Sequence, residues 1–172
     1  PVLFLDKVLM NPRKESVRGV EVFNFALLRE LTQLGVPLLV PVHPSWRGLI
    51  AASPRASGDT SLPLPIVWTP LPSNLLNGIL AVLRLRKRFG SVLLANSANS
   101  LVPAILLVRG LKRDAGIVLI AHREPSRRFL ASLPRPSTTV LAVNSIIASR
   151  FSAAGFTRVE TKYGIVHAGL FH

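Results

Sequence analysis

The chain has 172 residues, 49% of them hydrophobic and 17% charged, a composition that supports one packed core and excludes a disordered protein. It contains no cysteine, which excludes a disulfide scaffold, a thiolate metal site and a cysteine nucleophile. Twenty-one Lys and Arg against eight Asp and Glu give a formal net charge of +13, which indicates an anionic partner. Nucleic acid, an anionic membrane surface and a phosphorylated substrate all fit that description.

The first part of the chain predicts a strand, a helix, a strand and a long loop. Residues 2–6 are a short apolar run, and residues 19–34 repeat apolar side chains at the three- and four-residue spacing of a helix that a glycine ends. A second strand covers residues 37–42, where Pro41 indicates a strand end or a sheet edge. Residues 43–64 have no period, and long loops in compact domains are often functional.

The rest of the chain continues this alternation. We predict strands over residues 65–69, 91–95, 116–121, 139–143 and 158–162. We predict helices over residues 73–88, 100–113, 124–132 and 145–154. In the first of these helices we expect the sheet-facing side chains to be Leu75, Leu76, Ile79, Leu80 and Leu83. Apolar strands separated by helices are typical of a parallel sheet covered on both faces, so we predict a single α/β domain over residues 1–172, Rossmann-like and doubly wound.

Ligands of such sheets bind beyond the carboxyl ends of the strands, and two predicted features lie there. Gly19 begins the first helix, where free backbone N–H groups favour an anion, and Arg18 could grip a phosphate. A tight turn beside a solvated arginine explains both residues equally well. The sequence contains neither a dinucleotide-binding glycine motif nor a P-loop.

His122 directly follows the predicted strand over residues 116–121, where an imidazole can exchange a hydrogen bond with a substrate hydroxyl. A histidine that caps the strand end is an equal alternative. Glu124 could orient His122 or act as a base, although a carboxylate at a helix N-terminus is the simpler interpretation. The four histidines lack metal-ligand spacing, so we expect no metal site.

Two pairs of polar residues each follow a strand and precede a helix. They are Asn96 with Ser97, and Asn144 with Ser145. Asparagine and serine are good N-cap residues, so capping is the default explanation for both pairs. Their place at the ligand edge leaves recognition of a hydroxyl as the alternative.

The cations are concentrated in residues 84–128, which hold ten Lys and Arg against two acids, a surplus of eight. Several of them close two helices, where cations suit the helix dipole. Aromatic residues are only 6% of the chain and no RNA- or DNA-reading signature is present, so we do not expect a nucleic-acid partner. We expect electrostatic attachment to an anionic membrane surface, with a cytoplasmic protein held at its inner face.

Four segments carry a resemblance to a known family. They are RGVEVFNFALLRELTQLGVPLLVPV, SVLLANSANSLVPAILLVRG, GIVLIAHREP and VLAVNSIIASRFSAAGFTRVETKYGIVHAGLF. In this order they resemble the amino-terminal half of GT-B glycosyltransferases of the family 4 type. The third segment is similar to the strand that ends in that family's active-site histidine.

The resemblance implies a function and roles for several residues. Arg18 and Gly19 would face the diphosphate of a nucleotide diphosphate sugar, and His122 would contact the hexose in a retaining reaction without metal or cofactor. Residues 43–64 would meet the hydroxyl acceptor, with Trp46 and Arg47 as contacts. The family's nucleotide-sugar pocket lies in a carboxy-terminal domain that these 172 residues do not match, so we expect an acceptor-side domain with a donor-binding domain as its partner.

Two other functions stay open from the sequence. One is a Rossmann-like module that binds an anionic small molecule without catalysis. The other is a basic nucleic-acid-binding protein, whose affinity would fall steeply with salt.

Overall fold

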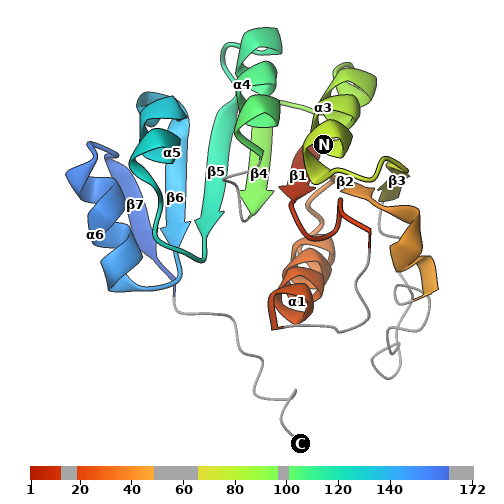
Figure 1. The fold of residues 1–172 in the computed structure, drawn as a ribbon, viewed down its shortest axis with the longest axis horizontal. Helices are drawn as coiled ribbons and strands as arrows, with labels where there is room; N and C mark the ends of the chain where they lie inside the picture. Colours follow the sequence, from red (N-terminus) through yellow and green to blue (C-terminus); the bar gives the residue numbers. More distant parts are fainter. Residues whose placement is uncertain (13–18, 49–65, 97–100, 163–172) are drawn as a thin grey trace, which may run out of the picture.

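The computed structural model describes residues 1–12, 19–48, 66–96 and 101–162, with only the backbone described over residues 19–25. Seven parallel strands form a single sheet in the order β3-β2-β1-β4-β5-β6-β7 (Figure 1). The strands are β1 (Val2–Asp6), β2 (Leu38–Val42), β3 (Ile66–Trp68), β4 (Val92–Asn96), β5 (Gly116–Ala121), β6 (Thr138–Ala142) and β7 (Arg158–Thr161). This architecture confirms the predicted Rossmann-like, doubly wound α/β class.

Helices connect these strands. They are α1 (Gly19–Gln33), α3 (Asn74–Leu85), α4 (Val102–Leu111), α5 (Arg127–Ser132) and α6 (Ser145–Ala153), with short 3-10 helices η1 (Pro44–Trp46) and η3 (Arg135–Ser137). Every predicted strand and helix is present, with its ends within three residues of the prediction. The 3-10 helix η1 lies inside the segment predicted as loop, where Pro44 supplies the first position and the side chain of His43 accepts a hydrogen bond from the Ser45 N–H.

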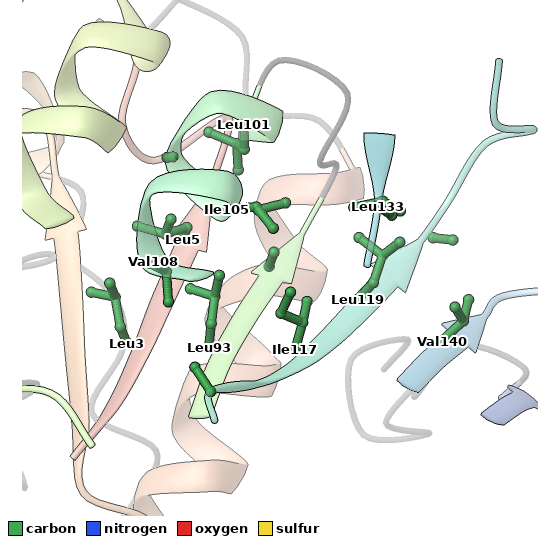
Figure 2. Packing of buried hydrophobic residues seen from close by; sticks show 14 of the residues in the cluster. Leu3, Leu5, Leu93, Leu101, Ile105, Val108, Ile117, Leu119, Leu133 and Val140 are labelled. Atoms are coloured by element: carbon green, nitrogen blue, oxygen red, sulfur yellow. The ribbon is translucent and has the colours of Figure 1, made fainter. Parts of the chain in front are cut away.

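The two faces of the sheet carry two hydrophobic clusters. The larger cluster joins Leu3, Leu5, Leu93 and Ile117 to side chains of α3, α4, α5 and α6 (Figure 2). The smaller one joins Phe4, Val40 and Ile120 to Leu28 of α1 and to Trp46. This division follows from right-handed crossovers, because the chain leaves β1 toward β3 on one face and returns through α3 to β4 on the other.

Helix α3 turns a different side to the sheet from the one predicted. Its buried residues are Asn77, Gly78, Ala81, Val82 and Leu85. Leu76 and Leu83, which we predicted to face inward, are 50% and 40% exposed. The spacing of leucine and isoleucine that predicted the inward side therefore marks a side that is partly exposed. Close packing selects the buried side, because a Cβ added to Gly78 would lie 3.3 Å from the Cβ of Ala104 on α4.

The predicted ends of two helices are confirmed, whereas only one of the two interpretations of Pro41 is confirmed. Gly35 and Gly155 have φ angles of 71° and 87°, a left-handed backbone that glycine adopts freely, and they end α1 and α6 as predicted. Strand β2 is not an edge strand, since it pairs with both β1 and β3. Pro41 is instead its penultimate residue, which leaves the end-of-strand interpretation.

Candidate functional site

The order of the strands reverses between β1 and β4, and the last residues of these two strands form a buried polar pair. Asp6 and Asn96 are register partners, and both are fully buried. The Nδ2 of Asn96 donates to Oδ2 of Asp6 at 2.9 Å. The other carboxylate oxygen of Asp6 accepts from the backbone N–H groups of Val8 and Leu9, both at 2.8 Å. The ends of β1 and β4 at the switch point are therefore held together by buried hydrogen bonds.

Asn96 was among the candidates from sequence, and Asp6 was missed. The signal for Asp6 was present, because an acid that closes a buried apolar strand must find hydrogen-bond donors. Sequence alone could not supply its partner, since 90 residues separate Asp6 from Asn96.

The segment after β1 is fastened to its neighbours by side-chain hydrogen bonds. The indole N–H of Trp46 donates to the Asn11 carbonyl at 2.9 Å, and the backbone N–H of Asn74 donates to Oδ1 of Asn11 at 3.0 Å. Asn77, buried on α3, donates to the Met10 carbonyl at 2.6 Å. Trp46, predicted as an acceptor contact, is only 2% exposed, so its ring is part of the core and offers no surface to an acceptor in this structure.

Arg47 lies next to Trp46 but on the surface. Its guanidinium sits 4.6 Å from the ring centroid of Trp68, a cation–π distance. Trp68 is the last residue of β3 and half-buried, so this pair lies at the carboxyl edge of the sheet. A guanidinium stacked over an indole presents a planar set of N–H donors, which suits a polar, ring-shaped ligand. Arg47 was predicted as an acceptor contact, whereas Trp68 was not among the predicted residues.

His122 directly follows β5, the strand beside β4, so it lies at the same edge as Asp6 and Asn96. The imidazole is half-buried, and this burial lowers the pKa of His122 from 6.5. It is therefore mainly neutral at pH 7, with one ring nitrogen as donor and the other as acceptor. A neutral imidazole can therefore either donate a hydrogen bond to a hydroxyl oxygen or accept one from a hydroxyl group.

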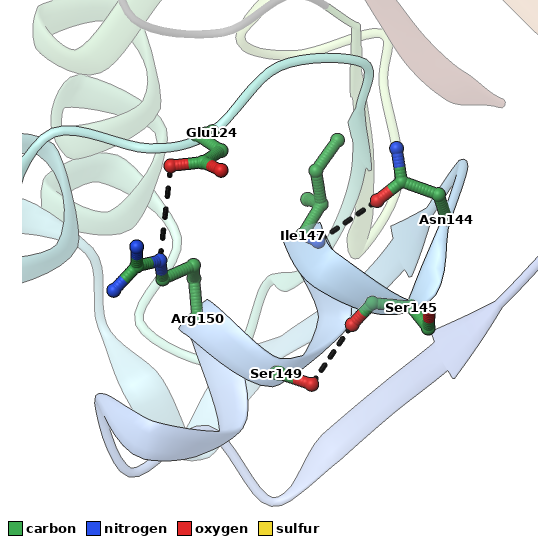
Figure 3. Close-up of polar contacts among 6 residues, drawn as sticks. All are labelled: Glu124, Asn144, Ser145, Ile147, Ser149 and Arg150. Atoms are coloured by element: carbon green, nitrogen blue, oxygen red, sulfur yellow. Dashed lines mark hydrogen bonds and ion pairs between the residues drawn. The ribbon is translucent and has the colours of Figure 1, made fainter.

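Glu124 lies outside any helix, which corrects the helix N-terminus interpretation. Helix α5 begins only at Arg127, and Ser126 caps it by accepting from the Phe129 N–H. One carboxylate oxygen of Glu124 lies 3.7 Å from Nε of Arg150 on α6, and both side chains are largely exposed (Figure 3). The carboxylate thus links the segment after β5 to α6.

Asn144 caps α6, as the default interpretation predicted. Its Oδ1 accepts from the Ile147 N–H at 2.9 Å, and the carbonyl of the exposed Ser145 accepts from Oγ of Ser149 (Figure 3). Capping occupies Oδ1 of Asn144, while the side chain of Ser145 remains at the surface.

The remaining candidates are less fully placed. Gly19 is the first residue of α1, as predicted. Arg18 and Ser97 lie outside the residues that the structure describes. Across residues 1–12, 19–48, 66–96 and 101–162 there is no group of three His, Asp or Glu side chains that could hold a metal ion.

Strand order and the polar carboxyl edge define the class: a doubly wound α/β protein with a candidate ligand site at its topological switch point. Comparisons with protein-family models, curated proteins and solved structures find no match to the chain.

Proposed function

We propose that this chain is the acceptor-side domain of a retaining glycosyltransferase, which moves a hexose from a nucleotide diphosphate sugar to a hydroxyl. The observation that carries the proposal is the position of the half-buried His122 directly after β5, one strand from the switch point. Ligands of doubly wound sheets bind at this edge. The resemblance of the segment GIVLIAHREP to the strand that ends in a catalytic histidine supports the same assignment.

His122 acts in this proposal as a hydrogen-bonding group near the reacting carbon of the sugar. A preorganised donor stabilises charge that develops on an oxygen in the transition state. Since burial keeps the imidazole neutral, it can donate one hydrogen bond and accept another without forming a tight ion pair with the substrate. The Asp6–Asn96 pair holds the neighbouring strand ends in place.

The donor and the acceptor approach this edge from different elements. The first turn of α1, at Gly19, faces the donor diphosphate together with Arg18. Arg47 and Trp68 stack against the acceptor at the β3 side of the edge. The nucleotide pocket belongs to a second, donor-binding domain, which supplies the other wall of the cleft.

A transfer assay tests the proposal. The protein joined to its donor-binding domain is incubated with UDP-glucose, GDP-mannose and related donors, and release of nucleoside diphosphate and the anomeric configuration of the product are followed. We expect transfer with retention that persists in EDTA. We expect no turnover by the 172-residue chain alone, because the leaving diphosphate needs groups from both walls of a closed cleft.

Two results would contradict the proposal. Turnover by the isolated chain would show that one wall suffices. Binding of a nucleotide or sugar phosphate by the two-domain protein, without transfer to water or to any hydroxyl, would favour the non-catalytic binding module instead.

A further inference from the structure

The outer sides of α3 and α4 carry exposed leucines, although both helices pack against the core. The two helices lie next to each other on one face of the sheet (Figure 1). Leu76 and Leu83 of α3 are 50% and 40% exposed, while Leu106 and Leu111 of α4 are 46% and 44% exposed. Leu76 and Leu83 are seven residues apart and therefore lie on the same side of α3. Single exposed leucines are ordinary, but here four of them lie on two adjacent helices.

Cations gather where these helices end. Arg84, Arg86, Lys87 and Arg88 at the end of α3 are exposed, and so is Arg113 after α4. The two ends lie together, because Nζ of Lys112 donates to the Phe89 carbonyl. The N–H of Gly90 also donates to the Pro1 carbonyl, which puts the end of α3 beside the start of β1, at the amino edge of the sheet. We call these five cations and four leucines the α3–α4 outer face.

Acids are missing from this part of the sequence. No Asp or Glu occurs between Asp59 and Asp114, an interval that contains all of α3 and α4. Neither of the two ion pairs found within the described ranges involves a cation of the α3–α4 outer face. An ordinary solvated helix surface carries mixed charges, so helix-dipole stabilisation accounts for cations at the helix ends but not for the leucines beside them.

We propose that the α3–α4 outer face docks this protein onto an anionic lipid surface, with the leucines inserted at the acyl boundary and the cations at the headgroups. Lipid phosphates supply negative charge and the acyl boundary supplies an apolar phase, so one partner matches both halves of the face. A second copy of this face offers one neighbouring acid, Asp114, against five cations, so mainly like charges would face each other. Nucleic acid matches the cations but leaves the leucines in water. No described helix is long and apolar enough to cross a membrane.

This docking differs from the purely electrostatic attachment predicted from sequence, because Leu76 and Leu83, which were expected to face the sheet, are exposed. The cations of the face lie at the edge opposite the candidate site, and no residue of the face belongs to that site, so the docking does not depend on the proposed glycosyl transfer. A surface whose cations lie at the amino edge can bind lipid while the carboxyl edge stays open to substrate.

Vesicle sedimentation measures the contributions of the cations and of the leucines separately. The native chain is compared with Leu83→Ser/Leu106→Ser and with Arg84→Gln/Arg86→Gln/Lys87→Gln/Arg88→Gln, on phosphatidylcholine vesicles with and without phosphatidylglycerol. Each cation contributes roughly fivefold to binding, so we expect the four-cation variant to bind about 100-fold or more weakly. We expect the two-leucine variant to bind at least about tenfold more weakly, because it loses the inserted apolar surface. Ile146→Ser, which removes a 62% exposed side chain at the start of α6, is the matched control and should bind like the native chain.

A fluorescence measurement locates the inserted residues. Since the chain has no cysteine, Leu106→Cys and Ile146→Cys each create one labelling site for a polarity-sensitive dye. We expect a blue shift on anionic vesicles at position 106 and none at position 146. Thermal unfolding of every variant confirms that it is folded.

Four outcomes would overturn the proposal. The first two are equal binding to neutral and anionic vesicles, and no loss of binding when the leucines are replaced. The third is self-association of the native chain without vesicle binding, which the leucine substitutions abolish. The fourth is binding of duplex DNA but not of vesicles.

Discussion

The two edges of the sheet are built from different chemistry. At the carboxyl edge, Asp6 and Asn96 are buried and hydrogen-bonded to each other, and the half-buried Asn144 caps α6. At the amino edge, exposed cations such as Arg84 and Arg113 lie near exposed apolar side chains such as Leu83 and Leu111. A buried polar group costs free energy unless it is hydrogen-bonded. Buried and paired polar groups therefore hold the carboxyl edge in one geometry.

The net positive charge could serve either a small anionic ligand or an extended anionic surface, and the difference between the two edges favours the second. Both ion pairs in the described part of the chain lie near the carboxyl ends of the strands, Arg150 with Glu124 and Lys162 with Glu160. The excess charge of α3 and α4 is at the opposite edge. A rigid polar edge suits a small ligand, whereas an unbalanced cationic and apolar edge suits an extended anionic surface.

The largest effect on stability is expected at the buried Asp6–Asn96 pair. Asp6→Ala removes the acceptor of three hydrogen bonds, from Asn96 and from the backbone of Val8 and Leu9, at a fully buried site. At about 1 kcal/mol for each lost bond, we expect the free energy of unfolding to fall by about 3 kcal/mol in urea denaturation. Asp114→Ala, at the exposed amino edge, is the control and should change it by less than about 0.5 kcal/mol. Equal effects of the two substitutions would remove the contrast between the edges.

The contact between α3 and α4 gives the next largest effect. A side chain at Gly78 meets Ala104, Leu101 and Met10, whereas at Gly110 nothing lies within 4 Å. We expect Gly78→Leu to destabilise the protein by about 2 kcal/mol through overpacking. Gly110→Ala should instead stabilise it by about 0.5 kcal/mol, since alanine favours the helix. A neutral Gly78→Leu in thermal unfolding would mean that the helices are not held as close as the structure shows.

The pH dependence of stability tests the burial of His122. Its pKa is lowered in the folded protein, so the unfolded chain binds the proton more readily and stability falls as the pH decreases below 6.5. In His122→Asn this loss disappears, and the free energy of unfolding should depend less on pH between 7 and 5.5. Urea denaturation at several pH values measures the slope. An unchanged slope would show that the imidazole is solvated.

The smallest effect is expected for the exposed pair of Glu124 and Arg150. At 3.7 Å, with both side chains more than half exposed, this ion pair contributes little. We expect Glu124→Gln to change the free energy of unfolding by less than about 0.5 kcal/mol. A larger loss would mean that the link between the segment after β5 and α6 stabilises the edge.

The fold could be predicted from the sequence because its signals are local. Apolar runs such as residues 2–6 and the glycines that end α1 and α6 each mark one element. The orientation of α3 could not be predicted, because its side toward the sheet is chosen by the approach of Ala104 to Gly78, a tertiary contact. Pro41 indicated a strand end or a sheet edge, and the sequence could not decide between them because strand order depends on pairings between distant segments.

The candidate site was predicted in part for the same reason. Asn96 ends β4 and His122 directly follows β5, and parallel strands bring such positions to one edge, so sequence order placed them together. The burial of Trp46 and the stacking of Arg47 on Trp68 depend on how residues 43–47 fold back on the sheet. The loop in which they were predicted carried no periodic pattern to indicate this.

The measurement that tests the central claim most directly is the turnover of His122→Ala in the protein joined to its donor-binding domain. Loss of one preorganised hydrogen-bonding group lowers kcat by roughly 10²–10³. We expect that loss with little change in thermal stability, while Asp114→Asn at the opposite edge keeps native turnover. A folded His122→Ala protein with native kcat would contradict the assignment of glycosyl transfer to the carboxyl edge and leave His122 as a strand-end residue.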